Sequence, residues 1–304
     1  MSSCKTNARP NGFTNCAGPL RELAERALAD AFRPGGPLGA GTAPERLVEA
    51  MRHAVLGGGK RMRPVLCLAT CQALCGEAEP ALGAAVAVEL LHSYTLVHDD
   101  LPCMDDDAVR RGLPTVHAKF GYAEAVLAGD ALQAAAFRVL AEKAPPPCVA
   151  ELAKAAGPAG VVGGQWVDVT AKPPHDTDRL LYVHEHKTAD LVACACRMGA
   201  ICAGASSAAT ELAGDFGDAI GKAFQMVDDL LDASDPRKKD ELSMLRLCSP
   251  EGVKTAAKIS TERAVLALSA LCPNPGLPRK QLAKAETAAE TLRALARAQL
   301  ARTF

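Results

Sequence analysis

The chain has 304 residues, a formal net charge of −1 at pH 7 and a composition that is 49% hydrophobic but only 4% aromatic. A nearly neutral chain has no overall field that would attract nucleic acid or an anionic membrane, so neither is an expected partner. No uninterrupted apolar run is long enough to cross a bilayer, and we expect no transmembrane segment. The length fits one large domain with an ample core, and the abundance of alanine and leucine favours helices over sheets.

The N-terminal segment and the twelve cysteines both bear on the compartment. Residues 1–16 have no apolar signal core, and their Ser, Thr and Asn content without acidic residues weakly resembles an organelle transit segment. We expect residues 1–18 to be a flexible segment and the protein to be cytoplasmic, where disulfides are rare. Cys67, Cys71 and Cys75 share one helix face, so we interpret them as small buried side chains and not as a zinc site.

Apolar residues recur at helical spacing along almost the whole chain. In chain order, the predicted helices cover residues 20–32, 44–55, 64–75, 81–98, 123–143, 149–170, 176–203, 208–233, 250–271 and 279–302. No segment alternates polar and apolar residues convincingly, as a strand would. The expected fold class is all-α: a single large helical bundle over residues 19–304, with its site in a central cavity between facing helices.

Two acidic clusters follow apolar helical stretches. The first lies within residues 99–107 and the second within residues 228–232. Carboxylates this crowded repel one another, so a fold keeps them together mainly where cations lie between them. Mg²⁺ prefers such hard oxygen ligands and usually shares its remaining positions with phosphate oxygens. We expect two facing clusters to hold a diphosphate through several Mg²⁺ ions.

The two clusters differ in form. Asp228 and Asp232 are four residues apart and share one helix face, and Gln225 precedes Asp228 by one turn. Asp99 and Asp105 are six residues apart, so an unbroken helix would not bring them together. Pro102 removes a helical hydrogen bond, and we expect the backbone around it to deform and bring Asp105 round.

Basic residues supply the expected complement to a diphosphate. A glycine turn, residues 57–59, precedes Lys60, Arg61 and Arg63; glycines let backbone N–H groups approach an anion, and the cations add charge-assisted hydrogen bonds. The spacing is not that of a Walker loop, and by itself this segment is weak evidence. Arg110 and Arg111 either contact phosphate or neutralise their acidic neighbours.

Three histidines need separate interpretations. His92 lies two helical turns before Asp99 on one face; such a residue is more often part of the core, but beside a diphosphate it could donate to an anion. His184 and His186 diverge on a helix, so we do not expect them to bind a metal. The useful groups of that segment are the cation of Lys187 and the hydroxyl of Thr188.

Together these segments resemble the trans-type polyprenyl diphosphate synthases, and among them the bacterial-type farnesyl and geranylgeranyl diphosphate synthases. The markers are residues 58–64, 99–111 and 127–132, Gly163-Gly164-Gln165 with Asp168, residues 186–188, and Phe224-Gln225 with residues 228–232. They occur in the family's order from about Pro44 to the C-terminus. The resemblance implies an all-helical fold around a deep cavity, usually in a homodimer, and condensation of isopentenyl diphosphate with an allylic diphosphate.

The resemblance also implies roles for individual residues. Mg²⁺ would be held by the acidic clusters (Asp99, Asp100, Asp105, Asp228, Asp229 and Asp232). The allylic diphosphate would be bound by Arg110, Lys187 and Lys238, and isopentenyl diphosphate by Lys60, Arg63, His92 and Arg111. Thr188 and Gln225, with Lys187, would act close to the reacting allylic carbon.

Product length is predicted from Tyr94, five residues before Asp99. A bulky ring there would narrow the cavity in which the product tail grows, and this pattern resembles farnesyl diphosphate synthases. We therefore expect a C15 product, with C20 as the alternative and ordinary core packing as the other interpretation of Tyr94. The chain departs from the family after Asp232, where a compressed segment, residues 233–240, leaves it ambiguous whether Lys238 or Lys239 corresponds to the family's lysine.

Two other functions fit part of the pattern. Some members of this superfamily are non-catalytic partner subunits, but these tend to have lost acidic residues that are intact here. A class I terpene cyclase would use similar metal chemistry. The second group of cations (Lys60, Arg63 and Arg111) and the scarcity of aromatic residues argue against a cyclase.

Overall fold

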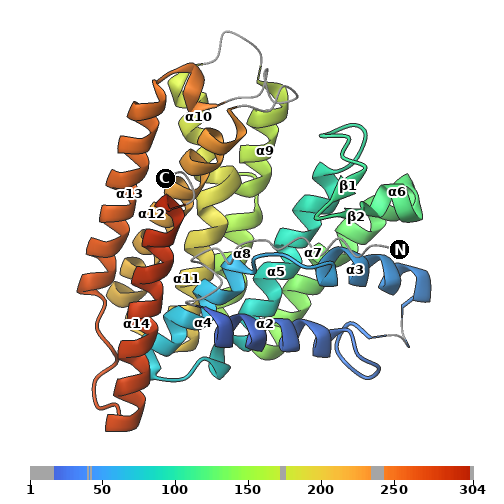
Figure 1. Cartoon of the computed structure of the whole chain (residues 1–304). Helices are drawn as coiled ribbons and strands as arrows, with labels where there is room; N and C mark the ends of the chain where they lie inside the picture. Colours follow the sequence, from blue (N-terminus) through green and yellow to red (C-terminus); the bar gives the residue numbers. More distant parts are fainter. Residues whose placement is uncertain (1–16, 40, 42, 172–175, 234–242, 302–304) are drawn as a thin grey trace, which may run out of the picture.

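The computed structural model describes residues 17–39, 41, 43–171, 176–233 and 243–301 (Figure 1). In chain order the elements are α2 (Gly18–Ala31), α3 (Glu45–Leu56), α4 (Met62–Cys75), η1 (Glu79–Ala81), α5 (Leu82–Asp99), β1 (Val109–Arg110), β2 (Leu113–Pro114), α6 (Val116–Phe120), α7 (Tyr122–Lys143), α8 (Pro147–Ala156), α9 (Val161–Thr170), α10 (Thr177–Val183), η2 (His184–Ala189), α11 (Asp190–Cys202), α12 (Ser207–Asp232), η4 (Met244–Arg246), α13 (Pro250–Ala270) and α14 (Arg279–Leu300). The all-helical prediction is confirmed.

Helices α4 and α5 form the centre of the bundle. Residues 64–71 of α4 and 84–91 of α5 are buried on every face, as expected for helices inside a large protein. Helix α4 packs against α5, α11 and α14, while α5 packs against α7. Within the described residues, Glu79–Asp99 is the one stretch long and apolar enough to cross a membrane, and 67% of its apolar window is buried in the bundle, which is typical of a core helix.

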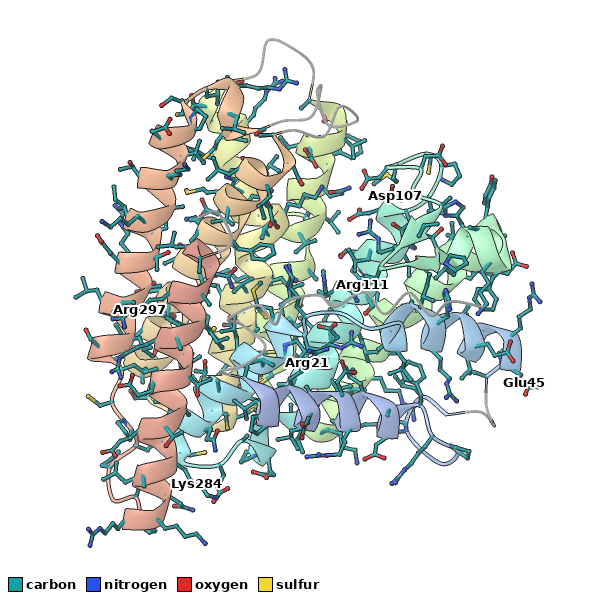
Figure 2. The ribbon with its side chains drawn as sticks, viewed as in Figure 1. Arg21, Glu45, Asp107, Arg111, Lys284 and Arg297 are labelled. Carbon is teal, nitrogen blue, oxygen red and sulfur yellow. The ribbon has the colours of Figure 1, made fainter. Side chains whose placement is uncertain are left out.

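The C-terminal helices close one side of the bundle. Helix α13 packs along α12, and α14 packs against α4 (Figure 1). Lys284 of α14 donates to both carboxylate oxygens of Glu77, just beyond α4, at 2.8 Å (Figure 2). The ion pair is partly exposed, so α14 is attached mainly by its buried apolar residues, among them Leu292 and Leu295.

Three local features differ from the helical prediction. A short antiparallel hairpin pairs Val109 with Pro114 and Arg110 with Leu113, and its strands are too short to show an alternating pattern in the sequence. The helix predicted over residues 149–170 is broken at residues 157–160, where Pro158 cannot donate a helical hydrogen bond. The helix predicted over residues 176–203 is interrupted by a π-helical segment, His184–Ala189.

Most of the cysteines expected in the core are buried, but Cys75 is only partly buried at the end of α4. Cys67, Cys71, Cys148, Cys194 and Cys196 are buried free thiols. Burial raises the pKa of Cys67, which keeps it protonated and unreactive at neutral pH.

Candidate functional site: an acidic and a basic centre along helix α5

The first acidic cluster wraps around the C-terminal end of α5. Asp99 is the last residue of the helix, and the chain then turns so that the Asp105 backbone N–H donates to the Asp99 carbonyl at 2.8 Å. Asp106 reaches a φ of 54°, in the left-handed region. The deformation after Leu101 therefore brings Asp105 beside Asp99, as the spacing required.

Asp99 and Asp100 are neighbours in sequence but have different partners. Asp100 is buried and accepts a hydrogen bond from Arg110 Nε at 2.6 Å, and the two side chains form an ion pair. Asp99 is half-buried and accepts a hydrogen bond from Gln165 Nε2 of α9 at 2.8 Å. Burial raises the pKa of Asp99 to about 6, with Asp105 adding to the rise and Lys187 opposing it. A carboxylate that is costly to ionise is suited to a nearby cation.

Helix α9 also orients Lys187. The Lys187 ammonium donates to Asp168 Oδ2 at 2.5 Å, one turn beyond Gln165. Burial alone would lower the pKa of Lys187, but the carboxylates of Asp168 and Asp99 raise it above its ordinary value. Lys187 is therefore a fixed cation between α9 and the end of α5.

The π-helical segment places Lys187 and Thr188 at the site. Single π turns within helices occur frequently at functional sites, because the extra residue changes the direction of the side chains. Here α9 packs closely on this turn: a Cβ added at Gly164 would overlap the backbone nitrogen of Lys187. Thr188 Oγ1 donates to Gln225 Oε1 of α12 at 2.8 Å, so the segment connects α9 to the second acidic cluster.

The carboxylates of the second cluster also differ in burial and in their contacts. Asp229 is buried and accepts a hydrogen bond from the Met244 backbone N–H at 2.9 Å, and its Oδ2 lies 3.2 Å from His184 Nε2. Asp229 therefore anchors the chain that returns after α12. Asp228 and Asp232 are half-buried on α12. Lys238 lies outside the described residues.

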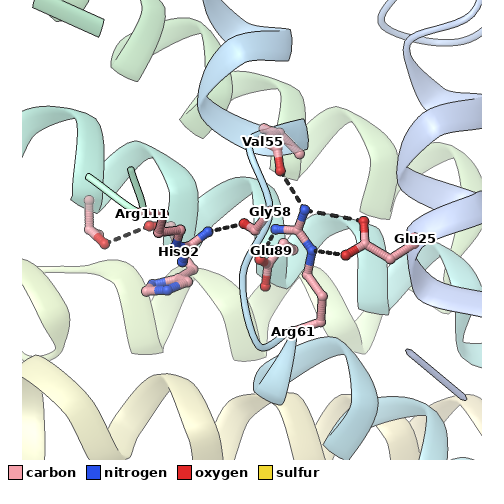
Figure 3. A network of polar contacts seen from close by, with 8 residues as sticks. Glu25, Val55, Gly58, Arg61, Glu89, His92 and Arg111 are labelled. Atoms are coloured by element: carbon pink, nitrogen blue, oxygen red, sulfur yellow. Dashed lines mark hydrogen bonds and ion pairs between the residues drawn. The ribbon is translucent and has the colours of Figure 1, made fainter. Parts of the chain in front are cut away.

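The basic residues form a second centre around His92 of α5, two turns before Asp99. Arg61 holds the surrounding backbone in place (Figure 3). The Arg61 guanidinium donates to Glu89 Oε1 at 2.7 Å, to Glu25 at 2.9 and 3.2 Å and to the Val55 carbonyl at 2.7 Å. Burial alone would lower the pKa of Arg61, but Glu89 and Glu25 raise it. Arg61 ties the glycine turn to α2, α3 and α5, and its neighbours Lys60 and Arg63 are positioned by it.

Arg63, His92 and Arg111 make up the cationic centre. Arg111 donates to the Gly58 carbonyl and lies beside His92 (Figure 3). Burial lowers the pKa of Arg63 to about 10, with Glu89 opposing the shift and Arg111 contributing to it. Burial and the charges of Arg63 and Arg111 hold the pKa of His92 well below its ordinary value. The buried Nε of Arg63 has no hydrogen-bond partner among the described residues. Cations that disfavour one another's charge in this way are suited to binding an anion.

The two centres are close to each other. His92 and Asp99 lie on one face of α5, two turns apart, or about 10 Å at 1.5 Å per residue. Lys60 Nζ lies 5.8 Å from the ring centroid of Phe224, the residue before Gln225 on α12, so the glycine turn reaches the second acidic helix. Tyr94 is buried on α5 with its ring 5.5 Å from that of His98, in an edge-on arrangement.

The acidic centre fits a hydrated Mg²⁺ ion better than a fully enclosed metal. Within the described part of the chain, no group of three His, Cys, Asp or Glu side chains converges closely enough to hold a metal alone. Mg²⁺ usually keeps several waters and combines one or two carboxylates with substrate phosphates. The raised pKa of Asp99 and the carboxylate pairs Asp99–Asp105 and Asp228–Asp232 agree with that mode.

Comparison with known proteins identifies the family. A family model described as polyprenyl synthetase matches residues 44–242. The chain belongs to this family. Geranylgeranyl pyrophosphate synthase 11 of Arabidopsis thaliana, named as chloroplastic, is 44% identical to this chain over 247 residues, which is 77% of the chain and 68% of that protein. Farnesyl diphosphate synthase of Escherichia coli K12 is 46% identical over 197 residues, or 61% of the chain and 66% of that protein.

The heterodimeric geranylgeranyl pyrophosphate synthase large subunit 1 of A. thaliana is 43% identical over 231 residues, or 72% of this chain, and the matched region spans 60% of that protein. Solved structures agree on the fold. An FPP/GFPP synthase from Zymomonas mobilis has a TM-score of 0.77 at 34% identity, covering 94% of the chain described here and 97% of that chain. A geranyltransferase from Helicobacter pylori has a TM-score of 0.75 at 30% identity, covering 96% and 99%.

Sequence reasoning gave no role to two residues of this site, Gln165 and Asp168. Both were recognised as family markers, and their spacing of three residues on one helix was the available signal. Their partners, Asp99 and Lys187, lie far away in the sequence and were found only through the packing of α9.

Proposed function

We propose that this chain is a Mg²⁺-dependent prenyltransferase that condenses isopentenyl diphosphate with an allylic diphosphate. The observation that carries the proposal is the pair of centres on one face of α5, one acidic at Asp99 and one around His92, where Arg63 and Arg111 supply the positive charge. Two diphosphate substrates need such different sites, because only one diphosphate leaves in the reaction and needs the greater charge stabilisation.

The proposed roles follow the contacts of each residue. Asp99, Asp105, Asp228 and Asp232 hold the Mg²⁺ ions, which when bound stabilise the negative charge of the allylic diphosphate as it leaves. Asp100 and Asp229 are the buried members of the two clusters, in contact with Arg110 and with the Met244 backbone, and we assign them to positioning Arg110 and the segment after α12. Lys187, Arg110 and Lys238 bind the allylic diphosphate, while Lys60, Arg63, His92 and Arg111 bind isopentenyl diphosphate.

The chain's own groups guide the condensation. Thr188 and Gln225 are joined by a hydrogen bond and direct their dipoles at the allylic carbon, where positive charge develops as the C–O bond breaks. The double bond of isopentenyl diphosphate attacks that carbon, and the proton it loses goes to the departing diphosphate. The apolar helices exclude water, which would otherwise trap the cation as an alcohol.

We propose a C15 product, farnesyl diphosphate, on the strength of Tyr94, with the C20 product as the alternative. Relatives carry both names, farnesyl in E. coli and geranylgeranyl in A. thaliana. A non-catalytic partner subunit is the other candidate, because one relative is named as the large subunit of a heterodimeric synthase. The intact carboxylate pairs favour an active enzyme.

The test is an assay of the purified full chain with Mg²⁺, isopentenyl diphosphate and C5, C10 or C15 allylic starters. Mass spectrometry of the products measures both activity and chain length. Asp105→Asn is expected to lower the rate at least about 100-fold because it removes a metal ligand. The adjacent exposed Asp106→Asn is the matched control and should keep activity. If the chain forms no product with any starter, the proposed activity is wrong and the non-catalytic partner subunit is favoured.

We also propose a homodimer formed through α7. Tyr122, Val126 and Leu127 are exposed apolar residues near the start of this helix, a pattern that favours a protein contact. Light scattering of the purified chain measures the oligomeric state, and Leu127→Glu should produce monomers.

For the compartment we propose the cytoplasm. Relatives named as chloroplastic favour an organelle instead. Residues 1–16 lie outside the described residues. Fusing residues 1–18 to a fluorescent reporter would reveal any import.

A further inference from the structure

Gln165 has an unusual hydrogen-bonding state for a half-buried amide. Its Nε2 donates to Asp99 Oδ1 at 2.8 Å. Its Oε1 is buried without a hydrogen-bond partner in the described part of the chain. A buried acceptor left unpaired costs about 1–3 kcal/mol, so an amide held only for stability would be a poor choice at this position.

The position of Gln165 is fixed from both sides. Gly164 brings α9 against the Lys187 backbone with no room for a side chain, which sets the distance between α9 and the π-helical segment. Asp168, one turn later, accepts the Lys187 hydrogen bond at 2.5 Å. Helix α9 therefore makes two polar contacts, from the Gln165 amide to Asp99 and from Asp168 to the Lys187 ammonium. A shift of the helix would disturb both contacts.

The chemistry of the amide suits a place beside a hydrated cation. The amide is uncharged, so donating its N–H leaves the negative charge of Asp99 available to a metal ion. An arginine or lysine in the same place would compete with the metal ion for Asp99. The unpaired Oε1 can accept one hydrogen bond. Waters bound to Mg²⁺ are strong donors, and Mg²⁺ usually keeps several of them.

We propose that Gln165 is a positioning residue for the metal centre: its N–H orients Asp99, and its Oε1 accepts a hydrogen bond from water bound to Mg²⁺. This inference rests on the proposed function, because it takes the acidic centre as a magnesium site. Outer partners of metal ligands typically contribute about 10- to 100-fold to metal affinity.

The test compares the full chain with Gln165→Met, which keeps the length of the side chain and removes both polar groups. Titration calorimetry measures Mg²⁺ binding in the presence of inorganic diphosphate. We expect Gln165→Met to weaken Mg²⁺ binding about tenfold or more. The melting temperature without Mg²⁺ should be unchanged or higher, because the unpaired oxygen is gone.

A purely structural Gln165 predicts the opposite pair of results, a lower melting temperature with unchanged Mg²⁺ affinity, and that outcome would overturn the inference. Trp166→Ala is the matched control, since Trp166 is 71% exposed on the same helix, and it should bind Mg²⁺ as the parent does. Gln165→Leu serves as a second variant if the Met protein does not fold: it also removes both polar groups without adding a charge, so it should weaken binding in the same way.

The outcomes separate this inference from the function on which it rests. If the parent chain binds no Mg²⁺ with diphosphate and forms no prenyl product, the proposed function fails. If the parent binds and Gln165→Met binds equally well, only the role of Gln165 is wrong. In active variants the Mg²⁺ concentration for half-maximal rate should rise while the KM for isopentenyl diphosphate stays the same.

Discussion

The Arg61 network gives the sharpest stability prediction. The side chains of Arg61 and Glu89 are 0% and 3% exposed, whereas that of Glu25 is 35% exposed. Arg61→Met would leave Glu89 as an unpaired buried charge, a change that typically destabilises by about 3–5 kcal/mol. Glu25→Gln removes a partly solvated partner and should cost less than about 1 kcal/mol.

Equilibrium urea unfolding of the chain, followed by circular dichroism, measures these differences. The double change Arg61→Met with Glu89→Leu is the decisive control, because replacing a whole buried ion pair with apolar groups is often nearly neutral. The double variant should therefore recover most of the stability lost by Arg61→Met alone. A loss below about 1 kcal/mol for Arg61→Met, or a double variant as unstable as the single one, would refute the reasoning.

Three further predictions concern the active centre. Tyr94→Ala should lengthen the products while Tyr94→Phe, which keeps the ring, should not, and an unchanged product spectrum in the alanine variant would remove the argument for C15. Because the pKa of Asp99 is raised to about 6 in the fold, ionising it costs stability as the pH rises above its unfolded value of 3.8. Asp99→Asn should accordingly be more stable than the parent without Mg²⁺ at pH 8, with the gap closing as the pH falls through 6 towards 4, as thermal melts at each pH would report. Gly164→Ala should destabilise by about 1–3 kcal/mol and slow turnover, since a methyl group would push α9 from the Lys187 backbone; equal urea midpoints would contradict this.

The helices could be predicted because their periodic apolar faces are a local property of the sequence. The sequence could not predict which of two adjacent carboxylates in each acidic cluster is the more buried one. Asp99 and Asp100 differ by about 100° around the helix, so the rotation of α5 decides between them, and tertiary packing sets that rotation. The same holds for Asp228 and Asp229.

The π-helical segment was also beyond sequence reasoning. A regular helix through His184 and Thr188 has no local signal for an inserted residue, and Gly164, which packs against this turn, lies on another helix. The hairpin at residues 109–114 was missed for a similar reason, since two-residue strands carry no pattern. Arg111 and Gly112 at its turn have φ of 55° and 77°, as a tight hairpin turn requires.

That hairpin has a consequence for how the two substrates communicate. Arg110 contacts Asp100 at the acidic end of α5, while the next residue, Arg111, reaches Gly58 at the other centre. The hairpin therefore contacts both proposed binding places, and a shift of the hairpin when one diphosphate binds would move a residue of the other place. In that case the KM for one substrate should fall when the other substrate is already bound.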